Sequence, residues 1–184
     1  HRVVEQLSQL RGAAMKVGQL LSMDAGDLLP REFSEILSRL RCDAHPMPMS
    51  QLVAVLNESW GKGWEGRFER FSFTPLAAAS IGQVHVAKGK DGQRLAIKVQ
   101  YPGVRESISS DVDNVATLLR MSGMLPKGMD IGPLLQEAKR QLQDEADYMK
   151  ETEHLRRFDQ LLADSPDFLV TRAYAQFRAP NTLV

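Results

Sequence analysis

The sequence predicts an α+β fold in which helices come first and an antiparallel sheet follows. Two observations carry this prediction. Residues 2–61 place apolar side chains at the three- and four-residue spacing of amphipathic helices, and from Arg67 the pattern changes to short alternating segments separated by turn residues. After Gly103 helical patterns return, and a strand-like tail follows them. This order of elements argues for α+β.

Three helices are predicted in the first third of the chain. The first covers residues 2–22, the second begins at Pro30, which suits a first helical position, and the third runs from Ser50 as its cap to Gly61 as its stop. The apolar stripe of the first helix is Val3, Leu7, Leu10, Ala14, Val17 and Leu21. The second helix is expected to bury Phe33, Ile36, Leu37 and Leu40.

The middle of the chain is predicted to be antiparallel sheet. Residues 67–73 are rich in aromatic side chains, and residues 82–88 and 93–100 alternate between apolar and polar side chains. The segment 89–92, Gly-Lys-Asp-Gly, lies between the two alternating runs and is typical of a hairpin turn.

The last part of the chain is predicted to hold two helices and two strands. One helix covers about 104–121 and a long one about 133–163, and the tail 167–184 is expected to form two strands around a turn at Pro180.

Composition bounds the class of protein. Hydrophobic residues make up 43% of the 184 residues, which is ordinary for a soluble globular protein. The 23 basic and 23 acidic residues cancel, so bulk nucleic-acid binding and polybasic attraction to a membrane surface are not indicated. No apolar run reaches the length of a membrane span. Because the chain opens at His1 and stops at Val184 within a strand pattern, we expect it to be a piece of a longer protein.

The single cysteine excludes an internal disulfide framework. Cys42 and His45 have the spacing of metal ligands, but no second ligand pair follows them. No metal site is therefore predicted in this chain.

Lys98 is the first candidate for chemistry. In the predicted strand Leu95, Ile97 and Val99 point to one face, and Lys98 points to the other with the small Ala96 beside it. One interpretation is a lysine on the solvated face of an edge strand. The other is the lysine of a V-A-I-K-type motif, which contacts the α- and β-phosphates of a nucleotide and pairs with a helix glutamate.

The loop before this hairpin is alanine-rich where a phosphate-binding loop would be glycine-rich. Small side chains at residues 77–82 keep close approach of a ligand open, but alanine resists the positive φ angles that glycine permits. The alternative is that the alanines pack against a neighbouring element.

Two helix faces add further candidates. Gly12, Lys16, Gln19 and Met23 lie together, about 160° from the apolar stripe of the first helix, and a glycine within a helix suggests that something packs close. On the long helix, a continuous helical path would put Asp147, Glu151, His154 and Phe158 on one face, with Glu145 pointing away. A solvated acidic face is the alternative interpretation.

Together these segments resemble a family, the UbiB-like (ADCK-type) atypical protein kinases associated with ubiquinone biosynthesis. The resemblance rests on the K-x-G-Q motif (residues 16–19), the run Ala77–His85 (AAASIGQVH), the strand Ala96-Ile97-Lys98 and the E-x-D motif (residues 145–147), in the family's order and with family-like spacing over essentially the whole chain. It implies a protein-kinase-like small lobe preceded by a helical N-terminal extension, with domain bounds at 1–65 and 66–184.

The resemblance also implies roles for individual residues. The catalytic residues it implies are Lys98, Glu151, Lys16, Gln19, Glu145 and Asp147, with Lys98 pairing with Glu151 and Lys16 pairing with Glu145 or Asp147. The nucleotide-binding residues it implies are Ala77, Ala78, Ala79, Ser80, Ile81, Gly82, Gln83 and Lys98. The helix that carries Lys16 and Gln19 would fold over the nucleotide site.

The sequence lacks the catalytic-loop aspartate and asparagine of a kinase-like site. It also lacks the D-F-G metal ligand, because Asp167-Phe168 is followed by Leu169 and not by glycine. The fragment alone is therefore not expected to transfer phosphate. The resemblance implies that the full protein binds ATP or ADP with Mg²⁺, whose ligands are expected in a missing large lobe, and that it hydrolyses ATP or phosphorylates a non-protein substrate.

The implied substrate is a lipid or quinone precursor, and proteins of quinone biosynthesis are further implied partners. The resemblance allows membrane association of the full-length protein. It implies a cytoplasmic or inner-membrane-peripheral location in bacteria and a mitochondrial one in eukaryotes. The alternative is a non-catalytic module that binds an isoprenoid lipid or a protein, with nucleotide as a switch.

Overall fold

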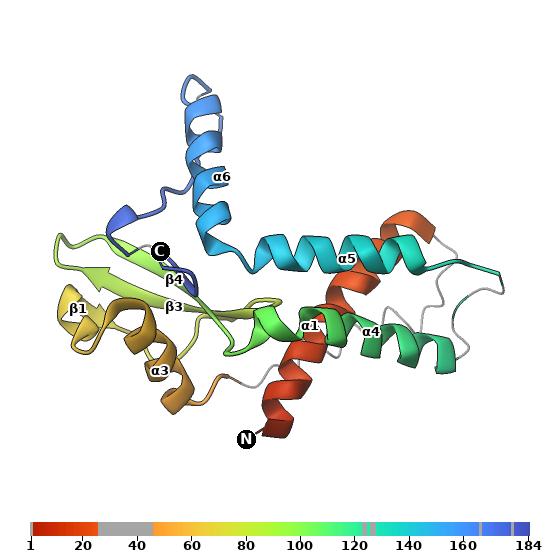
Figure 1. The fold of residues 1–184 in the computed structure, drawn as a ribbon. Helices are drawn as coiled ribbons and strands as arrows, with labels where there is room; N and C mark the ends of the chain where they lie inside the picture. Colours follow the sequence, from red (N-terminus) through yellow and green to blue (C-terminus); the bar gives the residue numbers. More distant parts are fainter. Residues whose placement is uncertain (1, 26–45, 123–124, 126–127, 166, 178) are drawn as a thin grey trace. The chain divides into compact units, whose positions relative to one another are not determined.

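A computed structural model describes residues 2–25, 46–122, 125, 128–165, 167–177 and 179–184. The elements in chain order are α1 (Arg2–Ala25), α3 (Met49–Trp60), the 3₁₀ helix η2 (Trp64–Arg67), β1 (Phe68–Phe71), β2 (Ala77–Ala78), β3 (Gly82–Gly89), β4 (Arg94–Gln100), α4 (Val104–Ser122), α5 (Gly132–Glu145), α6 (Tyr148–Leu161), η3 (Ala175–Phe177) and β5 (Thr182–Leu183) (Figure 1). No helix within these ranges has both the length and the apolar character needed to cross a membrane.

The chain forms two compact units by packing. Unit 1 takes its described residues from 1–46, 79–81 and 103–143, and unit 2 from 47–78, 82–102 and 144–184. α3 belongs to unit 2, where its Trp60 contacts the Phe68 ring of β1 with centroids 5.6 Å apart. The domain boundary between residues 65 and 66 stays a prediction about the organisation of the whole protein.

Unit 1 is helical and brings together α1, α4 and most of α5. α1 and α4 pack against each other, and an ion pair of 2.7 Å between Lys139 Nζ and Asp113 Oδ1 joins α5 to α4. Predicted helices at 2–22 and about 104–121 are confirmed, each with a small extension. The buried apolar side chains of α1, α4 and α5 include Ala13, Val17, Leu21, Val104, Ile108, Val112, Val115, Ala116, Leu119, Leu135, Ala138 and Leu142.

Unit 2 contains the antiparallel sheet, in the order β1-β3-β4-β5, with β2 pairing the other end of β3. The predicted hairpin is confirmed: β3 and β4 pair with Val84 opposite Lys98, and the turn closes with Gly89 N donating to the Gln93 carbonyl at 2.8 Å. Gly92 in this turn has φ of +82°, a conformation that favours glycine. The strand order places β4 inside the sheet, between β3 and β5.

The core of unit 2 combines α3, one face of the sheet and an aromatic cluster. Trp60, Trp64, Phe68 and Phe177 make mutual ring contacts, and the Trp60 indole N–H donates to the Phe177 carbonyl at 3.0 Å. These contacts hold the C-terminal segment against α3. The apolar side chains buried from α3 and the two central strands include Leu52, Val55, Leu56, Leu95, Ile97 and Val99.

The prediction for the cap of α3 is wrong. Ser50 is the second residue of the helix, and the residue before the helix is Pro48, whose side chain makes no capping hydrogen bond. Pro48 has a fixed φ of −53° and its carbonyl accepts from Gln51 N and Leu52 N, so backbone geometry starts the helix without a side-chain cap. Gly61 ends it as predicted, with φ of +81°. The predicted second helix, from Pro30, lies outside the described residues, as do Cys42 and His45.

The single long helix predicted at about 133–163 is also wrong, because the chain breaks after Glu145 and begins a new helix at Tyr148. Asp147 thereby leaves the predicted face, whereas Glu151, His154 and Phe158 still lie together on one face of α6. Asp147 lies outside both helices as the N-cap of α6.

The tail is a strand over a shorter length than predicted. Among the described residues of the tail, 167–174 have no regular structure and only β5 pairs with β4, with Leu183 opposite Lys98. Leu169 is 96% exposed, so the apolar segment around it gains no buried face that would favour a strand.

Candidate functional site

Lys98 projects from an inner strand rather than an edge strand. The buried neighbours Ile97 and Val99 face the core, and the Lys98 side chain, 25% exposed, lies on the opposite face. The interpretation of Lys98 as a solvated lysine on an edge strand is therefore wrong.

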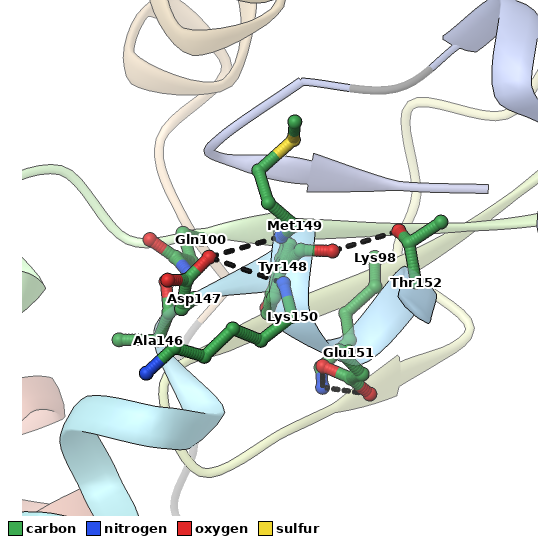
Figure 2. A network of polar contacts seen from close by, with 9 residues as sticks. All are labelled: Lys98, Gln100, Ala146, Asp147, Tyr148, Met149, Lys150, Glu151 and Thr152. Atoms are coloured by element: carbon green, nitrogen blue, oxygen red, sulfur yellow. Dashed lines mark hydrogen bonds and ion pairs between the residues drawn. The ribbon is translucent and has the colours of Figure 1, made fainter. Parts of the chain in front are cut away.

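Glu151 is the partner of Lys98. The Lys98 ammonium donates to both carboxylate oxygens of Glu151, at 3.2 Å to Oε1 and 3.1 Å to Oε2 (Figure 2). Because both side chains are partly exposed, the ion pair adds little to the stability of the fold. Its main effect is to hold the Lys98 ammonium group in one position. The ion pair that the sequence predicted is present, and contact with a nucleotide stays a prediction.

The break between α5 and α6 places Glu151. The buried Gln100 amide on β4 donates from Nε2 to the Ala146 carbonyl at 2.6 Å, which holds the break to the strand that carries Lys98. Asp147 Oδ1 then accepts from Met149 N at 3.1 Å and Lys150 N at 3.2 Å, two of the backbone donors that a helix start leaves unpaired (Figure 2). Glu151 follows in the first turn of α6.

Tyr148 lies beneath the ion pair. Its side chain is 0% exposed, and the Lys98 ammonium sits over its ring, 4.7 Å from the centroid. Burial, followed by the charges of Glu151 and Glu145, raises the pKa of Tyr148 far above its ordinary value, against a smaller opposing effect of the Gln100 side chain. The hydroxyl therefore stays protonated at neutral pH, and the ring is neutral there.

A cavity of about 500 Å³ opens in unit 2 around this pair. Apolar side chains from β3, β4 and β5 line it together with Lys98 and Glu151, which matches the usual size and composition of a small-molecule site. The apolar lining includes Val84, Ala96 and Leu183, and the cations in the lining are Arg94, Lys98 and Arg172.

The alanine-rich segment begins as a strand. Ala77 and Ala78 form β2, with Ala77 opposite Val84, and both side chains are exposed. They are thus not buried against a neighbour, and none of the described residues other than glycine takes a positive φ. Farther along, Ala79 and Ser80 are half-buried, and Ile81 and Gly82 are buried.

Gln83 faces away from Lys98. It is 2% exposed, its Oε1 accepts from Met47 N at 2.8 Å, and its Nε2 lies 2.8 Å from His85 Nε2. His85 Nδ1 lies 2.8 Å from the Ser72 carbonyl. With His85 protonated at Nδ1, Nδ1 donates to the Ser72 carbonyl and Nε2 accepts from Gln83 Nε2. Every polar group in this hydrogen-bond network then has a partner, so we assign the Gln83 and His85 side chains to the internal structure of unit 2.

The remaining predicted residues fall in different units. Lys16 is half-buried and Gln19 exposed on α1 in unit 1, whereas Glu145 and Asp147 belong to unit 2. The pairing of Lys16 with either carboxylate stays a prediction.

The expectation that something packs close to Gly12 is confirmed. This helical glycine is buried, and a Cβ atom at its position would overlap the carbonyl oxygen of Ser80, which belongs to the same unit. The absence of a side chain lets the α1 backbone approach the end of the alanine-rich segment.

Two site residues were missed by the prediction from sequence. Gln100 shares a strand face with Lys98 two residues away, and that alternation is a signal that could have identified it. Tyr148 had no such signal while residues 133–163 were taken as one continuous helix. In the part of the chain that the structure describes, no group of three or more His, Cys, Asp or Glu side chains could hold a metal ion.

Comparison with known proteins identifies the family. The model of a family described as the ABC1 atypical kinase-like domain matches residues 39–184. The chain is 42% identical over 182 residues to the mitochondrial atypical kinase COQ8 of Saccharomyces cerevisiae, covering 99% of this chain and 36% of the relative. It is 44% identical over 169 residues to the mitochondrial atypical kinase COQ8B of Rattus norvegicus, covering 92% of this chain and 32% of the relative.

A solved structure also matches. It is described as the complex of Rv3197 with erythromycin from Mycobacterium tuberculosis, with a TM-score of 0.57 and 35% identity over 99% of this chain and 46% of that one. The match supports the predicted kinase-like α+β fold. The chain spans about a third of the length of the curated relatives named above. The chain belongs to the ABC1 family of atypical kinase-like domains, the UbiB/COQ8 type.

Proposed function

We propose that this chain is the nucleotide-binding lobe of a UbiB-like atypical kinase or ATPase that supports ubiquinone biosynthesis. The full-length protein binds ATP or ADP with Mg²⁺, and it hydrolyses ATP or transfers the γ-phosphate to a non-protein acceptor such as a lipid or quinone precursor. Its location follows from its source, mitochondrial in a eukaryote and cytoplasmic or peripheral to the inner membrane in a bacterium.

The observation that carries the proposal is the Lys98–Glu151 ion pair at the wall of a cavity with apolar lining. Kinase-like sites use a strand lysine, held by a helix glutamate, to bind the α- and β-phosphates. In this chain the lysine and the glutamate meet at 3.1 Å beside a cavity of about 500 Å³. Relatives named as atypical kinases support the same assignment.

Different residues of the cavity are proposed to contact different parts of the nucleotide. Val84, Ala96 and Leu183 offer apolar surface to a planar base, and Lys98 supplies the fixed positive charge for phosphate oxygens. Glu151 keeps that charge in place before the nucleotide arrives, so that less ordering is needed on binding.

Magnesium would neutralise phosphate charge when bound. Its protein ligands are proposed to lie in other parts of the full-length protein, because the catalytic-loop and D-F-G residues of a kinase-like site are not in this sequence. Lys16 and Gln19 are proposed to close the site from the helix that carries the K-x-G-Q motif.

The experiment that tests this function is calorimetric titration of the full-length protein with ADP and Mg²⁺. Lys98→Ala is expected to weaken binding about tenfold or more, because a charge-assisted contact to phosphate is lost. Lys88→Ala is the matched control, since Lys88 lies on the neighbouring strand β3 and pairs with Glu69 at 2.8 Å. Equal nucleotide affinity of the wild type and Lys98→Ala would overturn the proposal.

The alternative is a module that binds a lipid or a protein without catalysis, and the titration with ADP does not distinguish it from an enzyme. It would bind nucleotide in the same cavity and show no turnover of ATP under any condition. Steady-state ATP hydrolysis by the full-length protein, lost in Lys98→Ala, separates the enzyme from such a module.

A further inference from the structure

We propose that Tyr148 is a positioning residue for Lys98, holding the ammonium group against Glu151 through the face of its ring. The proposal rests on the proposed function in one respect, that Lys98 contacts the phosphates of the nucleotide. The position of the ammonium group itself is a property of the nucleotide-free protein and can be tested without that assumption.

The geometry of the three side chains carries the inference. The Lys98 ammonium lies 4.7 Å from the Tyr148 ring centroid, within the distance at which a ring face attracts a cation. The same nitrogen reaches both oxygens of Glu151, so the cation is held by the carboxylate and by the ring face (Figure 2). A lysine side chain has four rotatable bonds, and a single salt bridge at a partly exposed site leaves much of that freedom.

The ring is itself fixed in place. Tyr148 is fully buried at the first position of α6, and its carbonyl accepts from the Thr152 hydroxyl at 2.7 Å. Gln100, two residues beyond Lys98 on β4, holds the preceding carbonyl of Ala146. The backbone at the start of α6 is thus anchored to the strand that carries Lys98, and burial restricts the ring that extends from it.

The ring, not the hydroxyl, performs this role. The Tyr148 hydroxyl is buried without a hydrogen-bond partner of ordinary geometry among the described residues. Removing the hydroxyl should therefore leave the Lys98 contact intact, whereas removing or electronically altering the ring should not.

The first experiment labels lysines in the nucleotide-free, full-length protein with an amine-reactive acylating reagent and follows each site by mass spectrometry. Tyr148→Leu is expected to raise the acylation rate of Lys98 by about threefold to tenfold, and Tyr148→Phe to leave it within twofold of the wild type. Lys88, whose side chain pairs with Glu69 elsewhere on the sheet, is the internal control and should react at one rate in all three proteins.

Tyr148→Leu also changes the packing around position 148 and could destabilise the fold. A second comparison therefore uses two aromatic residues of similar shape at this position. Phenylalanine and pentafluorophenylalanine at position 148 have nearly the same shape, but the fluorine atoms remove the negative face of the ring. Faster acylation of Lys98 with the fluorinated ring supports the proposal, and equal rates overturn it.

The second experiment measures the ADP affinity of Tyr148→Leu in the wild-type and Lys98→Ala backgrounds. A weakening of about threefold to tenfold in the first background and none in the second shows that Tyr148 acts through Lys98. A similar loss in both backgrounds shows a merely structural role and overturns the proposal. Leu56→Val, a buried change on α3, is the control for general loss of stability.

The two proposals fail in different ways. If Lys98→Ala does not weaken ADP binding, the proposed function fails while the acylation result still decides the role of Tyr148. If the fluorinated ring leaves Lys98 acylation unchanged, the role of Tyr148 fails while the function of Lys98 stands.

Discussion

At the residue scale, Gly82 is required by space rather than by backbone conformation. A Cβ atom at this position would overlap the Val99 carbonyl oxygen on β4, and Gly82 does not have positive φ. The glycine at the end of the alanine-rich segment therefore allows β3 and β4 to approach closely at the point where they begin to pair.

Gly82→Ala is accordingly expected to lower the free energy of unfolding by about 2 kcal/mol or more, because the strands must separate to admit the methyl group. Chemical denaturation measures the change. Gly66→Ala is the control, since no atom lies within 4 Å of a Cβ built at Gly66, and it should change stability by less than about 0.5 kcal/mol. Equal effects of the two substitutions would contradict the account.

His85 makes the stability of the fold depend on pH. Burial lowers the pKa of His85 below its ordinary value of 6.5, more than its hydrogen bond to Ser72 raises it. Protonation would place a second N–H opposite the Gln83 amide, whose carbonyl oxygen is already used by Met47 N. Between the folded and unfolded pKa values the unfolded chain binds more protons, so stability is lost as the pH falls below 6.5.

We therefore expect the free energy of unfolding to fall between pH 7.5 and pH 5.5, with a slope of up to about 1.4 kcal/mol per pH unit. His85→Asn should flatten this slope. His154→Asn, a change at an exposed histidine on α6, should keep it. Denaturation curves across this pH range check the prediction, which fails if the two variants have the same slope as each other.

At the element scale, the start of α6 sets the direction in which Glu151 points. Asp147→Ala removes the acceptor for Met149 N and Lys150 N, so we expect a loss of about 1 kcal/mol in stability and faster amide exchange in the first turn of α6. Asp147→Asn should retain most of the cap. Glu153→Ala, an exposed change on the same helix, should leave exchange in this turn unchanged, and a protected first turn in Asp147→Ala would refute the role of the cap.

The alanine-rich segment gives a prediction about nucleotide preference. Ala78 lies on β2 with an exposed side chain, and the restricted φ of alanine limits the backbone shapes that this segment can offer to phosphates. Ala78→Gly is expected to change the ratio of ATP to ADP affinity in the full-length protein. Calorimetry with both nucleotides measures this ratio, and an unchanged ratio would dispose of the idea.

The elements differ in how well the sequence predicts them, and the differences have physical causes. The β3–β4 hairpin was predictable because alternation and the Gly-Lys-Asp-Gly turn are local signals. The break at Ala146 was not predicted, although Asp147 is a residue type that favours an N-cap, because the break also depends on a hydrogen bond from Gln100, distant in sequence. The tail was overpredicted, because alternation alone does not reveal that only residues 182–183 pair with β4.

For the site, pattern and resemblance predicted the Lys98–Glu151 pair but not the contacts of the side chains around it. Gln83 was placed with the nucleotide-binding residues because of its motif, whereas its side chain lies on the opposite face of β3 from Val84 and bonds Met47 N and His85. Which face of β3 lies on the same side of the sheet as Lys98 follows from its register with β4, which a single sequence does not give.

At the scale of the whole molecule, the chain corresponds to about a third of the length of its curated relatives. The described part provides a cavity, a fixed cation and the strands that hold them. Under the proposed function, the catalytic aspartates and the metal ligands of a kinase-like enzyme would lie in other parts of the full-length protein. Binding of nucleotide in the cavity beside Lys98 is therefore the property that the proposed function requires.

The most direct test is nucleotide-dependent thermal stabilisation of the full-length protein, with and without Mg²⁺. A ligand that binds only the native state raises its stability by about 2.7 kcal/mol at a hundredfold excess over Kd. We expect ADP or ATP to raise the Tm of the wild type and Lys98→Ala to lose most of this rise. No shift with either nucleotide, or an equal shift in Lys98→Ala, would contradict the proposed function.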